Sequence, residues 1–258
     1  MRILFIGDIV GAPGRLAVEK LLPKIKKDEK IDFTLANAEN VAGGVGITPK
    51  TAQDLFDLGV DILTTGDHIW DRKEVLDIVA HPYFLRPANL SEQALGKGYC
   101  IISKLGLKLG AVSLQGRVFM RPVDCPFNAI KKIIPLIQKE TPNIIVDVHA
   151  EASSEKRALG WFLDGQVSAI LGTHTHIQTA DEEVLPQGSA YITDVGMSGP
   201  CDSVIGRNKE KVIETFITGM PARFEIATGD IQLQGAIIEI DNSTGKALSI
   251  KRVKEKLI

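Results

Sequence analysis

The sequence predicts an α/β fold in which two packed β-sheets are flanked by helices, a four-layer α/β/β/α sandwich. Two patterns carry this prediction. Over roughly the first two thirds of the chain, short apolar runs of strand length alternate with segments of helical periodicity, as they do in βαβ units. In the last third, strand-like segments follow one another across turn residues, which is typical of an antiparallel meander. Two sheets packed face to face, with the helices outside, accommodate both patterns.

The predicted elements of the first part begin with a strand that is apolar throughout. Ile3–Ile6 has no polar residue, which suits a strand buried on both faces. Further strands are predicted over 33–36 and 62–64, and a helix with apolar residues at helical spacing is predicted over 17–27. A second helix begins at Thr48, which is placed to cap it, continues with Pro49 at the first helical position, and ends before Gly59.

The middle and the end of the chain continue the same alternation. A hairpin is predicted with arms at 100–102 and 108–114. The remaining predicted helices cover 127–139, 154–163 and 209–216. The remaining predicted strands cover 144–148, 169–171, 191–193, 224–227, 232–240 and 248–253.

Length and composition predict one domain covering residues 1–258. The chain has 258 residues, of which 44% are hydrophobic, and it has no linker rich in serine or proline, no repeat and no low-complexity segment. A single α/β domain of this length can bury a full core.

Charge and hydropathy point to a cytoplasmic protein that binds neither membranes nor duplex nucleic acid strongly. The 30 basic and 32 acidic residues give a net charge of −2, so no strong overall field attracts nucleic acid. The apolar run near the start is too short for a signal peptide, and no stretch reaches the length of a membrane span. The three cysteines are too few and too widely spaced for a disulfide framework. A homo-oligomer is compatible with the sequence, although no segment marks a self-association surface.

Metal-binding residue types follow the predicted strands. The carboxyl ends of strands in an open α/β sheet converge on one edge, where ligands bind. The polar side chains at these ends are Asp8, Asn37, Glu39, Asn40, Asp67, His68, His149, His174 and His176. Four of the five histidines in the chain therefore lie at strand ends, and only His81 does not.

This set of side chains predicts a metal centre. Mixed imidazole and carboxylate ligands suit transition metals such as Mn, Fe, Zn, Co or Ni, whereas oxygen ligands alone would suggest Mg or Ca. The candidate ligands are too many for one ion but fit two. Two metals about 3.5–4 Å apart typically clamp an in-line displacement at phosphorus, so a binuclear phosphoesterase is expected.

The order of these motifs resembles the calcineurin-like metallophosphoesterases, and most closely their YmdB-like branch. The resemblance covers essentially the whole chain and consists of several spaced motifs. These motifs are Gly7–Gly11, Asn37–Asn40, Gly66–Asp71, Leu114–Arg117, Gly172–His176 and Asp194–Met197.

The resemblance implies a phosphodiesterase that hydrolyses cyclic nucleotides, notably 2′,3′-cyclic nucleotides, as its small phosphoester substrates. It implies two divalent or mixed-valence transition metal ions, with Fe or Mn expected first, and attack on phosphorus by a hydroxide that they activate. The implied metal ligands are Asp8, Glu39, Asn40, Asp67, His149, His174 and His176, with Glu39 shared between the ions. His68 would not be a ligand: it would protonate the leaving ribose oxygen. The alternative role for His68 is to orient a ligand.

The sequence departs from the family pattern at two places. The wider superfamily begins with Asp-x-His, but here Asp8 is followed by Ile9 and Val10, and Asn40 is expected to take the place of the missing ligand. The family has Asn where this chain has Asp67. A further carboxylate should hold the cations more tightly and make them weaker Lewis acids, and it could favour a trivalent ion in one site.

Two other functions share parts of this pattern. A phosphomonoesterase, including a protein phosphatase, has the same metal chemistry and differs mainly in the shape of its pocket. A regulatory interaction protein would keep the metal site for structure alone. His68 speaks against this last function, because a structural site needs no proton donor, whereas Asp67 favours it.

Two further features stay unassigned at the level of sequence. The backbone amides of the glycine-rich segment Gly43–Gly46 could approach a substrate phosphate, but a simple turn explains the glycines at least as well. Arg117 follows a strand and could pair with a phosphate or form a structural ion pair.

Overall fold

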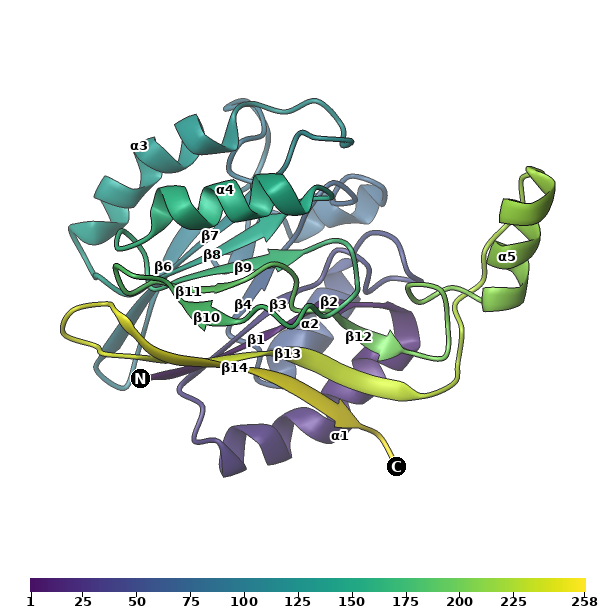
Figure 1. Cartoon of the computed structure of the whole chain (residues 1–258), viewed down its shortest axis with the longest axis horizontal. Helices are drawn as coiled ribbons and strands as arrows, with labels where there is room; N and C mark the ends of the chain where they lie inside the picture. The colour runs from purple at the N-terminus through teal and green to yellow at the C-terminus, as the bar shows by residue number, and fades with distance from the viewer.

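Two β-sheets lie face to face between two layers of helices in the computed structural model, which describes residues 1–258 (Figure 1). The eight-stranded sheet has the order β2-β12-β13-β1-β3-β4-β5, with β14 paired to β13. The strands of this sheet are β1 (Arg2–Ile6), β2 (Asp8–Ile9), β3 (Phe33–Asn37), β4 (Ile62–Thr64), β5 (Phe84–Leu85), β12 (Met197–Pro200), β13 (Ile231–Ile240) and β14 (Ala247–Lys256). The predicted two-sheet α/β architecture is confirmed.

The second sheet has six strands in the order β10-β11-β9-β8-β7-β6. Its strands are β6 (Tyr99–Lys104), β7 (Leu107–Gln115), β8 (Ile144–His149), β9 (Ala169–Thr173), β10 (Glu183–Val184) and β11 (Ala190–Ile192). Strands β7, β8, β9 and β11 run parallel, as do β1, β3, β4 and β5 in the first sheet. Each sheet therefore has a set of carboxyl ends from which ligand-binding residues can project.

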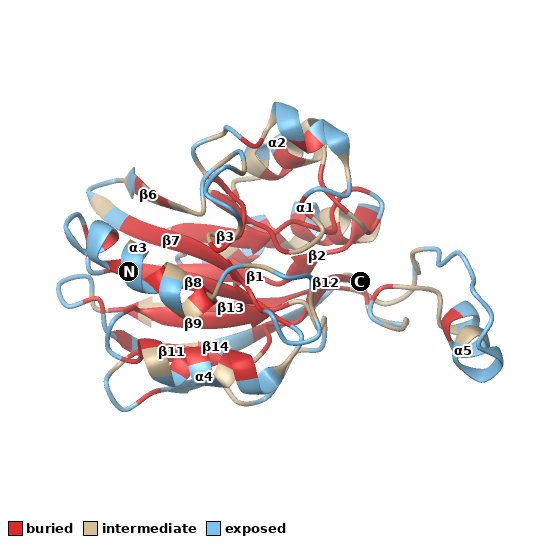
Figure 2. Ribbon diagram, turned by 90° about the horizontal axis from the view of Figure 1, so that it is seen from above, coloured by how far each residue is buried: buried red, intermediate tan, exposed pale blue.

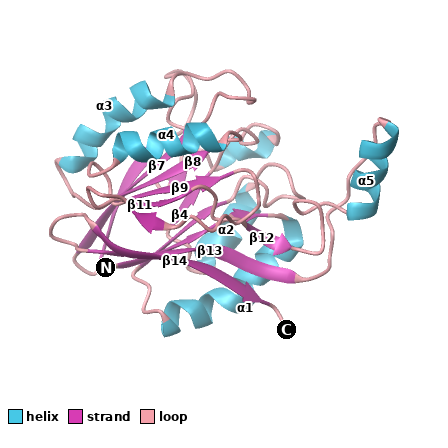
Figure 3. Cartoon of the chain, in the orientation of Figure 1, coloured by secondary structure: helices cyan, strands magenta, loops and turns pink.

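Helices cover the outer face of each sheet (Figure 3). The helices are α1 (Gly11–Asp28), α2 (Pro49–Asp57), α3 (Pro126–Gln138), α4 (Ser153–Leu163) and α5 (Lys209–Thr218), with a 3₁₀ helix at Lys73–Asp77. The predicted cap of α2 is confirmed, because the Thr48 side chain accepts from the Thr51 N–H, and Pro49 follows it. None of these helices has both the length and the apolar character needed to cross a bilayer.

Three apolar clusters hold the four layers together. Figure 2 shows that the buried residues are concentrated in the strands of the two sheets. The central cluster lies between the sheets, where Phe5 and Leu35 of one sheet meet residues such as Ile145 of the other. An outer cluster packs α1 and α2 on the first sheet, and another packs α3 and α4 on the second. Full burial of each such large apolar side chain contributes roughly 1.5–3 kcal/mol, so the sandwich positions its strand ends rigidly.

The strand predicted over 224–227 is wrong. Only Ile226 makes an isolated antiparallel bridge, with Arg207, and the rest of the segment is irregular. The reason is that β13 already pairs with β1 and β12 along one edge and with β14 along the other, so no backbone remains for a further strand. The segment instead closes the base of a projecting lobe.

That lobe consists of residues 209–224, and it includes α5. Figures 1 and 3 show α5 standing away from the sandwich. Within α5 only Val212 is buried, whereas Phe216 and Ile217 are 84% and 78% exposed. The lobe rests on a stem, residues 204–208 and 225–227, whose two sides are joined where the Asn208 N–H donates to the Glu225 carbonyl at 2.9 Å.

Candidate metal centre and active site

The predicted site residues converge at one end of the sandwich, and they come from the ends of strands in both sheets. The first sheet supplies those after β1, β3 and β4, and the second supplies those at the ends of β8 and β9. The structure brings together Asp8, Glu39, Asn40, Asp67, His68, His149, His174 and His176. The sequence predicted the convergence but not that two sheets share it. The roles of these residues as metal ligands and proton donor stay predictions.

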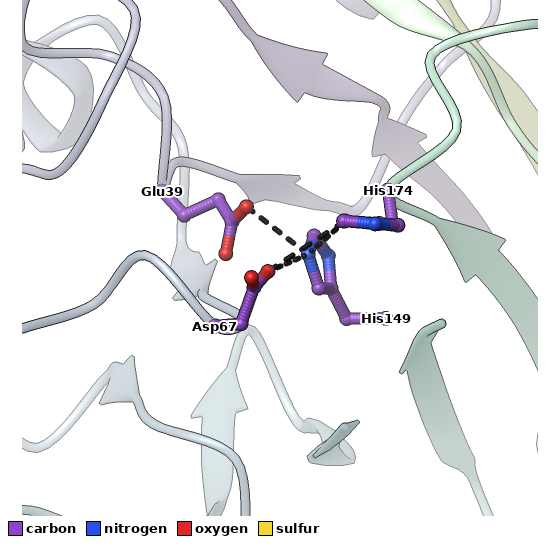
Figure 4. Close-up of side chains that lie close together, drawn as sticks. All are labelled: Glu39, Asp67, His149 and His174. Atoms are coloured by element: carbon purple, nitrogen blue, oxygen red, sulfur yellow. Dashed lines mark hydrogen bonds and ion pairs between the residues drawn. The ribbon is translucent and has the colours of Figure 1, made fainter. Parts of the chain in front are cut away.

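One group of side chains surrounds the fully buried ring of His149 (Figure 4). His149 Nε2 lies 3.0 Å from Glu39 Oε1 and 3.2 Å from Asp67 Oδ1. His174 Nδ1 lies 3.0 Å from the same nitrogen and 3.6 Å from Asp67 Oδ1. These four side chains offer nitrogen and oxygen atoms within 4.8 Å of one another, a spacing at which one cation could contact all of them.

A second group lies on the other side of Glu39. His176 Nε2 is 3.3 Å from the side-chain amide of Asn40 and 3.8 Å from Asp8 Oδ1. The Asn40 amide also donates to Glu39 Oε1 at 3.4 Å, so Glu39 joins the two groups. Asp8 Oδ1 is buried and has no hydrogen-bond partner, which is costly for a carboxylate oxygen unless a cation completes its environment. The donor set and this orphaned oxygen fit a second metal ion.

The loop that carries His174 and His176 is strained and is held from behind by Asp194. Both histidines have positive φ angles, 94° and 64°, which are uncommon for residues other than glycine. Asp194 Oδ2 accepts from the Thr175 N–H at 3.1 Å, from the Thr175 hydroxyl at 2.7 Å and from Lys156 Nζ at 2.8 Å. This buried ion pair stabilises a backbone conformation that directs both imidazoles into the site.

The orientation of His149 is set by residues behind it. The Thr173 hydroxyl donates to Asp147 Oδ1 at 2.7 Å, so its oxygen is left to accept from His149 Nδ1 at 2.9 Å. His149 then presents Nε2 to Glu39 and Asp67. Burial raises the pKa of Asp147 to about 6, although His149 acts in the opposite direction.

Without a metal, the charges of the site compensate one another around His149. Burial alone would lower its pKa, but attraction to Glu39 and hydrogen bonds to Asp67 and Glu39 outweigh burial and raise the pKa of His149 well above its ordinary value. For the two carboxylates burial acts in the other direction and would raise the pKa of Glu39 and of Asp67. His149 outweighs burial here too, and it holds the pKa of each carboxylate below its usual range. Burial, reinforced by the nearby His149, lowers the pKa of His174 to about 4. The carboxylates that favour the charged form of His149 would also favour a cation at the same position.

His68 lies beside this cluster and is oriented by Asp71, whose role the sequence analysis missed. His68 Nδ1 is 2.7 Å from Asp71 Oδ2. The other Asp71 oxygen accepts from Arg121 at 3.3 Å, and the same Arg121 nitrogen donates to the Asp67 carbonyl. Asp71 belongs to the Gly66–Asp71 motif, so its spacing three residues after His68 is the signal that could have revealed it.

A pocket of about 270 Å³ opens onto these side chains. It is lined by Val10, Glu39, Asn40, Gly44, His68, Glu151, His174, Thr175, His176, Ile205 and Arg207. A larger hollow of about 680 Å³ lies between α1 and β14, but no histidine lines it. Predicted site residues therefore line the smaller pocket and not the larger one.

Two lining residues of this pocket, Ile205 and Arg207, come from the stem of the lobe. The Ile205 carbonyl lies 3.0 Å from His176 Nδ1, which leaves His176 Nε2 facing Asp8 and Asn40. No local pattern in the sequence marks these residues, because they reach the site only through the tertiary fold.

The glycine-rich segment forms a turn at the edge of the pocket. The Gly44 N–H donates to the Asn40 carbonyl at 3.1 Å, so it is not free for a phosphate. Gly43, Gly44 and Gly46 all have positive φ, which explains the glycines by the turn itself. Arg117 is exposed, and Glu155 accepts its backbone N–H.

Comparison with known proteins gives a consistent result. Residues 4–253 match the family described as YmdB-like protein. The 2′,3′-cyclic-nucleotide 2′-phosphodiesterase of Bacillus subtilis is 48% identical, over 98% of this chain and 96% of that protein. The crystal structure of a hypothetical protein from Thermus thermophilus superposes with a TM-score of 0.94 at 38% identity, covering 100% of both chains. That of a novel phosphatase from Mycoplasma pneumoniae gives 0.92 at 35% identity, covering 99% of this chain and 93% of that one.

Proposed function

Because the chain belongs to the YmdB-like family of the calcineurin-like metallophosphoesterases, we propose that it hydrolyses 2′,3′-cyclic nucleotides at a centre of two metal ions. The chain is a hydrolase of phosphoric esters; the cyclic nucleotide is the proposed part. The relative that is 48% identical is named for this substrate. The observation that carries the proposal is the His68–Asp71 pair beside the cluster, because a structural metal site needs no proton donor.

The two groups of side chains described above would hold the ions. Glu39, Asp67, His149 and His174 would hold one, and Asp8, Asn40 and His176 the other, with Glu39 contacting both. When bound, two such ions, Fe or Mn in this proposal, would lower the pKa of a water molecule and offset charge on the phosphate. The fit rests on the mixed donor set and on the buried Asp8 oxygen that has no partner.

His68 would supply the proton that the leaving oxygen needs. Hydrolysis of a cyclic phosphodiester breaks one P–O bond and leaves an alkoxide, which is a strong base. In the doubly protonated form of His68, Nδ1–H would donate to Asp71 and Nε2–H would be the proton that is given to the leaving oxygen. Arg121 keeps Asp71 in place by binding its second oxygen.

The pocket suits a small phosphoester. Its volume of about 270 Å³ admits the phosphate and part of a nucleoside, whereas a duplex could not reach the buried His149. Location in the cytoplasm and self-association stay predictions.

A substrate screen tests the proposed function. Protein reconstituted separately with Mn and with Fe would be assayed on 2′,3′-cyclic nucleotides, 3′,5′-cyclic nucleotides and a phosphomonoester panel. We expect the highest kcat/KM on 2′,3′-cyclic nucleotides and its loss in His68→Ala. Preference for monoesters would instead make the chain a phosphatase. A metal-loaded protein that hydrolyses no phosphoester, and in which His68→Ala changes only stability, would make the site structural.

A further inference from the structure

Arg207 is a pocket-lining cation that the chemistry described so far does not use. It lies in the stem of the lobe, in a tight turn where its N–H donates to the Val204 carbonyl at 2.9 Å and its carbonyl accepts from the Val204 N–H at 3.0 Å. A bridge to Ile226 fixes the same backbone from the other side of the stem. The backbone of Arg207 is therefore held firmly at the wall of the pocket.

The guanidinium of Arg207 has no carboxylate partner. Its one hydrogen bond goes from Nη2 to the Gly44 carbonyl at 2.8 Å, and it takes part in no ion pair. Burial lowers its pKa, and no neighbouring acid counteracts this. An arginine has several N–H donors in a planar fork, so most of its donors have no acceptor from the protein. A half-buried guanidinium with unpaired N–H groups destabilises the folded protein unless an anion binds it.

Arg72 shows that the pocket does not need Arg207 merely to hold the glycine-rich turn. Arg72 Nε donates to the Ala42 and Val45 carbonyls, at 3.0 Å each, and Arg72 does not line the pocket. The turn is thus already fastened from outside by a second arginine.

Gly44, whose positive φ the turn requires, lies against the Arg207 guanidinium. A Cβ on Gly44 would lie 2.7 Å from Arg207 Nη1 and 3.0 Å from its Cζ, which is closer than real contacts allow. The glycine therefore leaves room for a charged group that faces a cavity, beside residues that the proposed function assigns to the metals.

We propose that Arg207 binds the phosphate of the substrate, its unpaired N–H groups donating to non-bridging phosphate oxygens. This proposal rests on the proposed function for the identity of the ester, but the anion-binding role follows from the pocket itself. The planar fork of arginine matches two oxygens of one phosphate, which lysine cannot reproduce. Arg207 would thus be a substrate-binding residue that lies in the stem of the lobe, whereas the predicted metal ligands lie at strand ends.

The test measures phosphate binding apart from turnover. Isothermal titration of metal-loaded protein with inorganic phosphate would be compared for wild type, Arg207→Met and Arg207→Lys, with a thermal melt to confirm that each is folded. We expect Arg207→Met to raise the Kd for phosphate, and the KM for the ester, on the order of tenfold to a hundredfold, because a hydrogen bond to a charged group is lost. Arg207→Lys should lie between Arg207→Met and wild type.

Arg72→Met is the matched control, since it also loosens the glycine-rich turn but removes no donor from the pocket. It should leave the Kd for phosphate near the wild-type value. The proposal would be overturned if Arg72→Met and Arg207→Met weakened phosphate binding equally, or if Arg207→Met left the Kd for phosphate unchanged. Arg207 would then only stabilise the glycine-rich turn. If phosphate binds through Arg207 but no cyclic nucleotide is hydrolysed, the proposed function fails while the role of Arg207 stands.

Discussion

At the scale of single residues, the site is organised around the buried imidazole of His149. Two carboxylates, Glu39 and Asp67, contact its Nε2, and Thr173 contacts its Nδ1. The carboxylates raise the pKa of His149, so they favour the ring that carries an additional proton. A metal ion at the same position must displace that proton.

Metal uptake should therefore release protons. The folded-state pKa of His149 is raised, so at pH 7 the metal-free protein carries the proton and loses it on binding; the release should decline as the pH rises through that pKa. Titration with Mn²⁺ in buffers of different ionisation enthalpy counts the protons released. His149→Asn should release fewer, whereas His81→Ala, which lies away from the site beside Phe56, should match wild type. Release that grows with pH would contradict this account.

The carboxylate at position 67 should strengthen metal binding. We expect Asp67→Asn to weaken it about tenfold, roughly 1.4 kcal/mol, because one negative charge leaves the cluster. Competition with a chelator measures the affinity, and Asp57→Asn on the exposed end of α2 is the control. If metal content and rate are both unchanged in Asp67→Asn, the residue is not a ligand of consequence.

Asp71 should matter most when the leaving group needs a proton. Asp71→Asn replaces the carboxylate that orients His68 by a neutral amide, whose NH2 group can face Nδ1 instead, so kcat on a cyclic nucleotide should fall on the order of tenfold or more. A p-nitrophenyl phosphodiester, whose leaving group departs without protonation, should be hydrolysed almost as fast as by wild type. Equal slowing on both substrates would mean that Asp71 serves the structure and not the proton transfer.

At the scale of elements, the sequence predicted those with a clear period or cap. The apolar run of β1 and the Thr48 cap of α2 are local features, and both were predicted correctly. Strands β2, β5, β10 and β12 were missed, because none of them contains a run of three apolar or β-branched residues. The segment 224–227 has strand-like residues, but a strand also needs a free neighbour with which to pair. Both edges of the nearby β13 are already paired with other strands.

The same distinction explains which site residues the sequence could predict. The candidate ligands each follow an apolar strand, so their convergence could be inferred from the chain alone. Ile205 and Arg207 reach the pocket from an irregular stem, and their contacts with His176 and Gly44 exist only after folding. No spacing along the chain could have identified them.

The lobe itself should be dispensable for the metal site. Its ends meet at the Asn208–Glu225 hydrogen bond, so a Gly-Ser link can replace residues 209–224 without moving the stem. We expect unchanged metal content and a change of no more than about 1 kcal/mol in the free energy of unfolding, because the contacts of Ile205 and Arg207 remain. Denaturant unfolding and metal analysis check this.

A longer deletion provides the contrast. Removing residues 204–227 also removes the stem, and metal affinity should then fall because His176 loses the carbonyl that orients it. If the short deletion alone already abolishes metal binding, the lobe contributes more to the site than its exposed position indicates.

At the scale of the whole molecule, the site joins the two sheets. Asp67 follows β4 of one sheet, and His149 ends β8 of the other. The two-sheet architecture was predictable because βαβ alternation and a strand-rich end require separate layers, but the strand order was not, since it depends on pairing between distant segments.

A cation held across the sheets should stabilise the whole fold. At a metal concentration of about one hundred times Kd, binding to the native state alone adds about 2.7 kcal/mol to the free energy of unfolding. Calorimetry should therefore show a higher Tm with Mn²⁺ than with a chelator, and His149→Asn should lose most of this difference. If the wild-type protein has the same Tm with Mn²⁺ as with a chelator, no ion bridges the sheets.

The position of β1 also affects when the centre can form during synthesis. β1 lies between β3 and β13, with Arg2 paired to Glu239, and β2 pairs with β12, which itself pairs with β13. Until residues 231–240 emerge from the ribosome, the strand that leads to Asp8 has a neighbour on one side only. Pairing between such distant segments forms slowly, because the entropy cost of closing a long loop comes before the stabilising contacts are made. The nascent chain is thus expected to acquire its metals late, only after residues 231–240 have been translated.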